Sequence, residues 1–319
     1  MALQQIDLNE DVLREILSHA DIQSVFQLCQ VNKMLCHQHD DLFRQIYQRL
    51  YCQTGMTVYK SEETTWFQLI KQCYLLEQLR ITLPILNMYS IKKLYTLQVL
   101  NLSNNQLSAL PPEMGQLSSL KILCLSHNQL SVLPPEMGQM HDLHCLNLSY
   151  NQLSALPPEM GQLSALQTLY MYNNQLNALP PEIGQLSDFQ YLSLYNNKLS
   201  ALPPEIGQLY ALQKLDLSHN QLSALPPEMG QMRALQYLDL SYNQLSILPQ
   251  EIGQLRALQY LNLSTNQLIA LPPEIGQLRA LQILYLNHNQ LSALPSEMGQ
   301  LSHLQILNLS YNQLSALPP

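Results

Sequence analysis

The chain has 319 residues, a formal net charge of −8 and 12% charged residues. This acidic balance excludes nucleic acid as the expected partner, because a phosphate backbone is bound by a Lys/Arg surface. Charges recur throughout residues 1–30, so the sequence predicts no signal peptide, no membrane span and a cytoplasmic protein.

Cysteine usage gives no sign of a metal or disulfide protein. The six cysteines include no Cys-x-x-Cys pair, which predicts reduced thiols. Cys29, Cys36, His37 and His39 lie close together in the sequence, but their spacing matches no usual zinc-finger pattern. We therefore predict no metal and no other cofactor.

Residues 1–75 do not repeat and show helical apolar spacing. Asn9 can cap a helix whose apolar residues recur three and four apart between Val12 and Leu17. A second amphipathic helix is predicted to begin at Asp21, and the apolar residues between positions 35 and 51 predict a third.

This segment resembles the F-box motif. The resemblance lies in Leu8-Asn-Glu-Asp-Val-Leu-Arg-Glu-Ile-Leu, which continues to Lys33, and in Asp40-Asp-Leu-Phe-Arg-Gln-Ile-Tyr47. F-box proteins use this helical module to dock on the Skp-type adaptor of cullin ubiquitin ligases, and the rest of the chain selects the substrate. The resemblance implies that the adaptor is contacted by Leu8, Asn9, Glu10, Val12, Leu13, Ile16, Leu17, Ile22, Val25, Leu28 and Val31.

A second interpretation of residues 1–75 stays open. Repeat proteins need a cap over the apolar end of their first repeat, and these helices could serve only as that cap. Both roles are compatible, since an F-box joined to a repeat domain also covers its end.

Residues 76–96 are predicted to be a degenerate first repeat. Leu76, Leu79, Ile81 and Leu86 follow the leucine spacing of the later units, but Pro84 stands where their asparagine belongs. Terminal repeats are commonly atypical, so we place a domain boundary near residue 75.

From residue 97 onward, the pattern Leu-x-x-Leu-x-Leu-x-x-Asn-x-Leu returns every 23 residues in ten units. A short fixed period is the signature of a solenoid, in which stacked units share one core. The pattern matches the leucine-rich repeat family. We predict an α/β fold: a leucine-rich-repeat solenoid over residues 97–319, with parallel strands on the concave face and short turns or 3-10 pieces on the convex face, after an N-terminal α-helical F-box-like domain.

The spacing within one unit predicts its local structure. Leu100 and Leu102 point inward from a short strand, while Val99 points outward. The proline pair and glycine of Leu-Pro-Pro-Glu-Met-Gly-Gln restrict the return segment to turns or 3-10 pieces. By the family resemblance, the asparagines from Asn105 to Asn312 turn inward and bond backbone groups between coils.

The residues that change between copies of the repeat gather on the outward side of the predicted strands. Ten of the 17 tyrosines fall there, and tyrosine is enriched at protein interfaces. β-propensity alone is the alternative explanation, but charged residues lie between the tyrosines, which favours a protein-binding face. We predict target contacts by Tyr170, Tyr172, Tyr191, Tyr195, Lys214, Asp216, His219, Tyr237, Asp239, Tyr242, Tyr260 and Tyr285, with His127, Tyr150, His288 and Tyr311 toward the ends.

Two acids in this set occupy equivalent positions on neighbouring strands. Asp216 and Asp239 could attract a Lys or Arg of a partner, although Lys214 lies nearby. Asp216, Ser218 and His219 include the residue types of a hydrolase, but an open strand face offers neither an orienting pocket nor oxyanion donors. We therefore predict no enzyme.

The sequence favours a non-catalytic substrate receptor: residues 1–75 recruit a Skp-type adaptor and the strand face holds a target protein. The uniform Leu-Pro-x-Glu-Ile-Gly repeats resemble those of bacterial proteins, whereas F-boxes belong to eukaryotic machinery, which suggests a bacterial effector acting in a host cell. A plain interaction scaffold is the alternative. A ubiquitin ligase with its own catalytic cysteine would need an added domain that this sequence does not contain.

Overall fold

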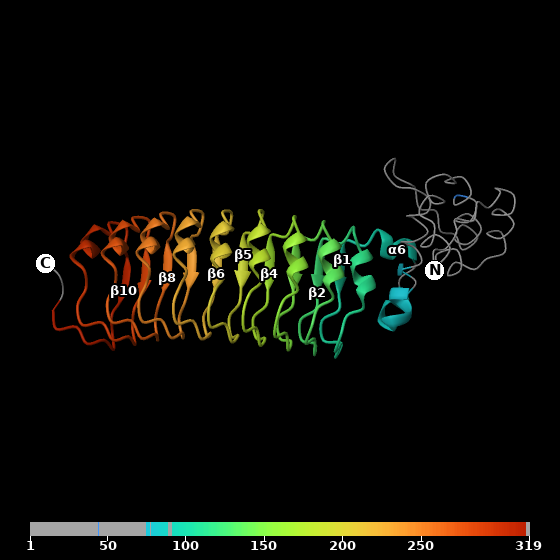
Figure 1. Cartoon of the computed structure of the whole chain (residues 1–319), viewed down its shortest axis with the longest axis horizontal. Coiled ribbons are helices and arrows are strands. Elements are labelled where there is room, and N and C mark those ends of the chain that lie inside the picture. The colour runs from blue at the N-terminus through green and yellow to red at the C-terminus, as the bar shows by residue number, and fades with distance from the viewer. Residues whose placement is uncertain (1–43, 45–74, 77, 89–90, 317–319) are drawn as a thin grey trace, which may run out of the picture. The chain divides into compact units, whose positions relative to one another are not determined.

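The protein divides into two compact units, residues 1–97 and 98–319. The computed structural model describes residues 44, 75–76, 78–88 and 91–316 (Figure 1). The eleven residues predicted to contact the adaptor lie outside this described part of the chain. Within it, no helix is both long enough and apolar enough to span a bilayer.

The described end of the first unit is helical. Residues 75–76 and 78–82 are in α-helix, followed by the 3-10 helix η2 (Pro84–Met88) and the helix α6 (Ile91–Tyr95). The strand-bearing repeat predicted over residues 76–96 is therefore wrong for its described residues. The spacing misled because leucines three and four apart also make a helical stripe: Leu76 and Leu79 are fully buried, whereas Ile81, off that stripe, is 63% exposed.

The second unit contains one open, ten-stranded parallel sheet whose strands follow chain order (Figure 1). Every strand pairs with the next at an offset of 23 residues, as Leu215 does with Leu238. The strands are β1 Val99–Asn101, β2 Ile122–Cys124, β3 Cys145–Asn147, β4 Thr168–Tyr170, β5 Tyr191–Ser193, β6 Lys214–Asp216, β7 Tyr237–Asp239, β8 Tyr260–Asn262, β9 Ile283–Tyr285 and β10 Ile306–Asn308.

Short 3-10 helices form the opposite side of the coils, as predicted. The proline before each helix holds an extended backbone, with φ of −69° at Pro203, and the chain then makes little more than one turn. These helices are η3 Pro112–Gln116, η4 Pro135–Gln139, η5 Pro158–Gln162, η6 Pro181–Gln185, η7 Pro204–Gln208, η8 Pro227–Gln231, η9 Gln250–Gln254, η10 Pro273–Gln277 and η11 Ser296–Gln300.

The core is a stack of equivalent apolar side chains. In the sixth coil, Leu215, Leu217, Leu222 and Met229 are essentially inaccessible to solvent, and the same positions are buried in neighbouring coils. Since each coil is too thin to cover its own leucines, its apolar surface is removed from water only by the coils on either side. The predicted inward direction of Leu100 and Leu102 is confirmed.

The asparagine of each repeat joins one coil to the next, which confirms the prediction made for it. Asn220 Nδ2 donates to the carbonyl oxygens of Leu194 and Leu217, both at 3.0 Å. Its Oδ1 accepts the backbone N–H of Leu199 at 3.0 Å. The side chain thus satisfies buried backbone groups of two coils, groups that would otherwise be costly to leave unpaired.

The repeated glycine is required by close packing between coils, in addition to limiting the helix. A Cβ placed on Gly207 would overlap the carbonyl oxygen of Glu228 in the next coil, whereas a Cβ on Gly299 would meet nothing within 4 Å. Backbone cannot yield as a flexible side chain can. The same residue type is therefore under very different constraint in the sixth coil and the last one.

We expect Gly207→Ala to lower the free energy of unfolding by about 1–3 kcal/mol, because the coils must separate to admit the methyl group. Gly299→Ala is the matched control and should change it by less than about 1 kcal/mol. Urea titration followed by circular dichroism compares the two. Equal losses would contradict the contact as the reason for the glycine.

Candidate protein-binding face

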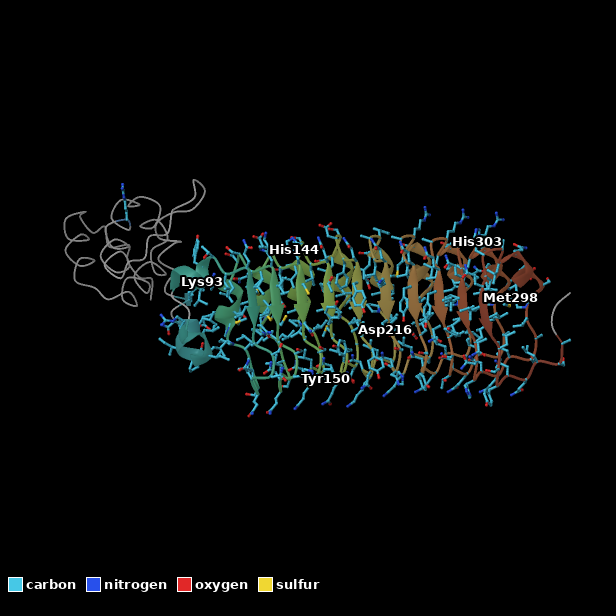
Figure 2. All side chains as sticks on the ribbon, turned by 180° about the vertical axis from the view of Figure 1, so that it is seen from behind. Lys93, His144, Tyr150, Asp216, Met298 and His303 are labelled. Carbon is cyan, nitrogen blue, oxygen red and sulfur yellow. The ribbon has the colours of Figure 1, made fainter. Side chains whose placement is uncertain are left out.

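The outward side chains of the sheet form parallel rows, one member per coil. Because the register is constant, the first strand positions carry Tyr191, Lys214 and Tyr237 side by side. The third positions bring together a row of smaller polar residues. In Figure 2, Asp216 lies near the middle of this strand face. The four members of the polar row are Ser193, Asp216, Asp239 and Asn262.

The structure brings the twelve predicted contact residues to one side of the sheet, but not all lie on strands. Tyr172, Tyr195, His219 and Tyr242 follow the three-residue strands, so their assignment to strand positions is wrong. Strands end early because the chain turns through a left-handed conformation, with φ of 53° at His219 and 54° at Tyr242. The strand-borne members are Tyr170, Tyr191, Lys214, Asp216, Tyr237, Asp239, Tyr260 and Tyr285.

Aromatic rings pack on one another in two groups. Over β7 to β9, Tyr237 and Tyr260 stack with centroids 4.3 Å apart, and Tyr285 meets Tyr260 edge-on at 5.9 Å. Over β4 and β5, Tyr170 contacts Tyr191 at 5.2 Å. Such contacts hold the rings in fixed orientations, and the strand tyrosines remain half-buried rather than covered.

A third set of rings lines the left-handed turn. His219 stacks on Tyr242 with centroids 4.1 Å apart and meets Tyr195 edge-on at 5.0 Å. The same His-on-Tyr stack recurs toward the ends of the unit, at 4.2 Å in each case. These end pairs are His127 with Tyr150 and His288 with Tyr311.

The two acids of the polar row differ in what their carboxylates can offer. Asp239 is only 9% exposed; its Oδ1 accepts from Ser241, and its Oδ2 accepts from Asn262 Nδ2 at 3.1 Å. Asp216 Oδ1 accepts the backbone N–H of Ser218 at 3.0 Å and its hydroxyl at 2.5 Å. Its Oδ2 has no hydrogen-bond partner within the described part of the chain, so Asp216 is the acid available to a ligand.

Burial dominates the protonation of this row. It raises the pKa of the Asp216 carboxyl, and the neighbouring Asp239 charge raises it further, although the Ser218 hydrogen bonds act against the shift. The pKa of the Tyr237 hydroxyl is raised well above its ordinary value by burial and by Asp239. The tyrosine therefore stays neutral and the exposed carboxylate oxygen is poorly compensated.

The serines that fix these carboxylates were not predicted from the sequence. Each accepting residue stands two positions before its serine, in the pattern Asn/Asp-Leu-Ser, and Asn147 makes the same bonds to Ser149 at 3.1 and 2.6 Å. This short-range motif was the available signal. Its role is to fix the side chain at the end of the strand.

Asp216, Ser218 and His219 do not form a nucleophile and base. The Ser218 hydroxyl donates to Asp216, and Ser218 is buried. The His219 ring instead packs between Tyr195 and Tyr242. A serine without a base in hydrogen-bond reach lacks the activation that hydrolysis requires.

An open parallel sheet backed by 3-10 helices, with a ring-rich outward face, defines a repeat protein that binds partners through that face. The family model for "Leucine rich repeat" matches residues 118–176, 164–222, 210–268 and 271–319, and a two-copy model matches residues 95–135. The chain belongs to the leucine-rich-repeat family. It also matches the F-box domain over residues 6–38, ahead of the repeats. Both domains are typically non-catalytic interaction modules, and no catalytic family is indicated.

Solved structures show the same fold in larger proteins. A leucine-rich-repeat protein of Leptospira interrogans is 33% identical, with 69% of this chain and 85% of that chain covered and a TM-score of 0.41. The plant peptide hormone receptor RGFR1, in complex with RGF2, is 29% identical, with coverage of 70% and 41% and a TM-score of 0.59.

A further similar structure is the TLR13–ssRNA13 complex, at 28% identity, coverage of 69% and 35%, and a TM-score of 0.61. The chain thus spans less than half the length of these two receptors. A comparison with curated protein sequences finds no match.

We expect Asp216→Asn to stabilise the fold at pH 7, because asparagine makes the same serine bonds at Asn147 without a buried charge. An acid whose pKa is raised on folding destabilises the native state as pH rises from its ordinary 3.8 through the folded value. The gain should therefore disappear below pH 3.8. Denaturant titrations at both pH values measure it.

Asp188→Asn, at an exposed position of the same unit, controls for the loss of one negative charge and should change stability little. A destabilising Asp216→Asn at pH 7, or an equal gain at low pH, would show that the carboxylate is not strained by burial.

Proposed function

We propose that this protein is the substrate-recognition subunit of an SCF-type ubiquitin ligase. In this role residues 1–75 dock on the Skp-type adaptor, the described end of residues 76–96 follows, and the solenoid over residues 97–319 holds the protein to be ubiquitinated. The observation that carries the proposal is an F-box domain and a leucine-rich-repeat unit in a single chain. Ubiquitin transfer is left to the other subunits.

The proposed adaptor contact is made by eleven residues of the F-box segment. Most are apolar, and they recur at helical spacing within the match at residues 6–38, which suits a helical module that buries one face against a partner. They are Leu8, Asn9, Glu10, Val12, Leu13, Ile16, Leu17, Ile22, Val25, Leu28 and Val31.

The proposed target surface is the strand face. Ten strands about 4.8 Å apart span roughly 43 Å, which is long enough for a protein interface. Its tyrosines are half-buried and mutually packed, so little side-chain entropy is lost when they contact a partner. RGFR1 in complex with RGF2 shows a related scaffold with a peptide-hormone ligand.

Within this face, Asp216 is the proposed receptor for a lysine or arginine of the target. Its free Oδ2 lies among tyrosine rings, and a cation brought there would gain both the carboxylate and ring contacts. Asp239 contributes charge, since its own oxygens are already bonded. Lys214 is exposed beside them, so its side chain can move aside.

A purified-component pulldown with a Skp-type adaptor tests the proposal. We expect the intact chain to retain the adaptor and the double variant Leu13→Asp, Ile16→Asp to lose at least about 90% of it, because two charges cannot be buried in an apolar contact. Circular dichroism must show the repeats still folded in that variant.

Tyr237→Ala with Tyr260→Ala is the matched control, because it alters the target face and should leave adaptor capture unchanged. Failure of the intact chain to capture the adaptor, together with no effect of the double aspartate variant, would leave a plain leucine-rich-repeat scaffold whose first residues only cap the repeats. Self-ubiquitination without a cullin would instead indicate an enzyme.

We further propose that the protein is a bacterial effector working in the cytoplasm of a host cell. The support is the joining of a domain of eukaryotic ubiquitin ligases to repeats as uniform as those of bacterial proteins, most of which differ at few positions outside the strand face. Fractionation of infected cells would test it: recovery of the protein only with the bacteria would contradict an effector role.

A further inference from the structure

Three arginines occupy one equivalent position in consecutive coils. Arg233, Arg256 and Arg279 are all exposed and lie 23 residues apart. Each backbone N–H donates to the carbonyl oxygen two residues before it, at 2.8 Å in every case. Because the three backbones share one conformation, the side chains leave the coils from corresponding points and form a single row, named here the arginine row.

The arginine row lies along one edge of the strand face. His303 Nδ1 bonds the carbonyl oxygen of Arg279 at 2.8 Å. Figure 2 shows His303 at this edge, with Asp216 nearer the middle of the face and Tyr150 beyond it. The backbone of Gln236 and Gln259 continues the ladder from the strands toward the arginines, so the row keeps the coil spacing.

The row is a local exception to the charge of its unit. Residues 98–319 contain six Lys or Arg against thirteen Asp or Glu, and half of these cations are in the row. The residue after each arginine is alanine: Ala234, Ala257 and Ala280. No ion pair joins the three guanidinium groups to a carboxylate among the residues that the structure describes.

The spacing of the row selects the form of an acidic partner. Two coil steps span about 9.6 Å. Residues i, i+4 and i+7 of an α-helix lie on one face and span about 10.5 Å. Alternate residues of an extended strand cover about 13 Å over two steps. Flexible arginines absorb a mismatch of about 1 Å more readily than one of several ångströms, so a helix fits better.

We propose that the arginine row docks a helix of a partner protein that carries acidic side chains at i, i+4 and i+7 and lies along the solenoid axis. Each guanidinium then meets one carboxylate, with geometry that allows paired hydrogen bonds. The inference extends the proposed target face by a contact of opposite charge, and it rests on that face binding a protein rather than on adaptor docking.

A nucleic acid fits this surface less well, although it is also anionic. Three cations span only about 10 Å, and the remainder of the unit is acidic. A long polyanion would meet repulsion on both sides of the row, whereas a short acidic stripe ends where the arginines end.

Binding of designed peptides to the full chain tests the proposal by fluorescence anisotropy. One alanine-rich peptide, longer than about 15 residues so that it is helical, carries three glutamates at i, i+4 and i+7. A second has the same composition with the glutamates spread around the helix. We expect the striped peptide to bind at least about five-fold more tightly at low salt, and the difference to shrink at about 1 M salt.

Arg256→Glu should weaken binding of the striped peptide by about five-fold or more, because it reverses the central charge of three. Lys121→Glu changes the net charge equally at another exposed position and should weaken binding less than about two-fold. Matching thermal unfolding midpoints for both variants would exclude a folding defect.

Equal binding of the two peptides, equal effects of the two variants, or no binding of the striped peptide would overturn the proposal. Tighter binding of a single-stranded oligonucleotide than of the striped peptide would also overturn it and indicate a nucleic-acid surface. Adaptor capture does not involve the arginine row, so either result can be obtained whether or not the adaptor binds.

Discussion

The whole repeat unit depends on the inward asparagine that joins each coil to its neighbour. Its amide donates to the carbonyls of two coils and accepts a backbone N–H, as Asn220 does with Leu194, Leu217 and Leu199. A thin coil exposes backbone groups to an apolar interior, and these bonds satisfy them. They also fix the offset of 23 residues, since any other register would leave amides and carbonyls unpaired.

A fixed register turns sequence position into surface position. Residues one period apart become neighbours, so a tyrosine in two adjacent coils becomes a ring stack, as with Tyr237 and Tyr260. In the same way Asp216 and Asp239 become adjacent acids. The strand face can therefore vary freely while the interior remains uniform, because the leucines, asparagines and glycines alone hold the coils together.

This separation suits a protein whose role is to recognise another. The interior provides a rigid frame, and the surface presents an aromatic field with a carboxylate near its middle and the arginine row at its edge. Charges of opposite sign at defined places favour one orientation of a partner and disfavour others. The F-box domain at residues 6–38 lies outside this frame, so docking and selection are assigned to different parts of the chain.

The sequence alone determined most of the fold. Because leucine, asparagine and proline act within one coil and its immediate neighbours, their period predicted the strands, the 3-10 helices and the buried rows. The same period failed over residues 76–96, where leucines three and four apart satisfy a helix equally well. It also located the recognition residues on one face, since sites that vary within a constant repeat are not needed for packing.

Other features were decided only by the tertiary structure, because they depend on contacts between coils that no local pattern contains. Asp239 is covered by Asn262, while Asp216 keeps a free oxygen. The glycines are required by the approach of the next coil, except at Gly299. Three separated arginines become one row because stacking brings residues 23 positions apart to about 4.8 Å, a distance that sequence separation does not express.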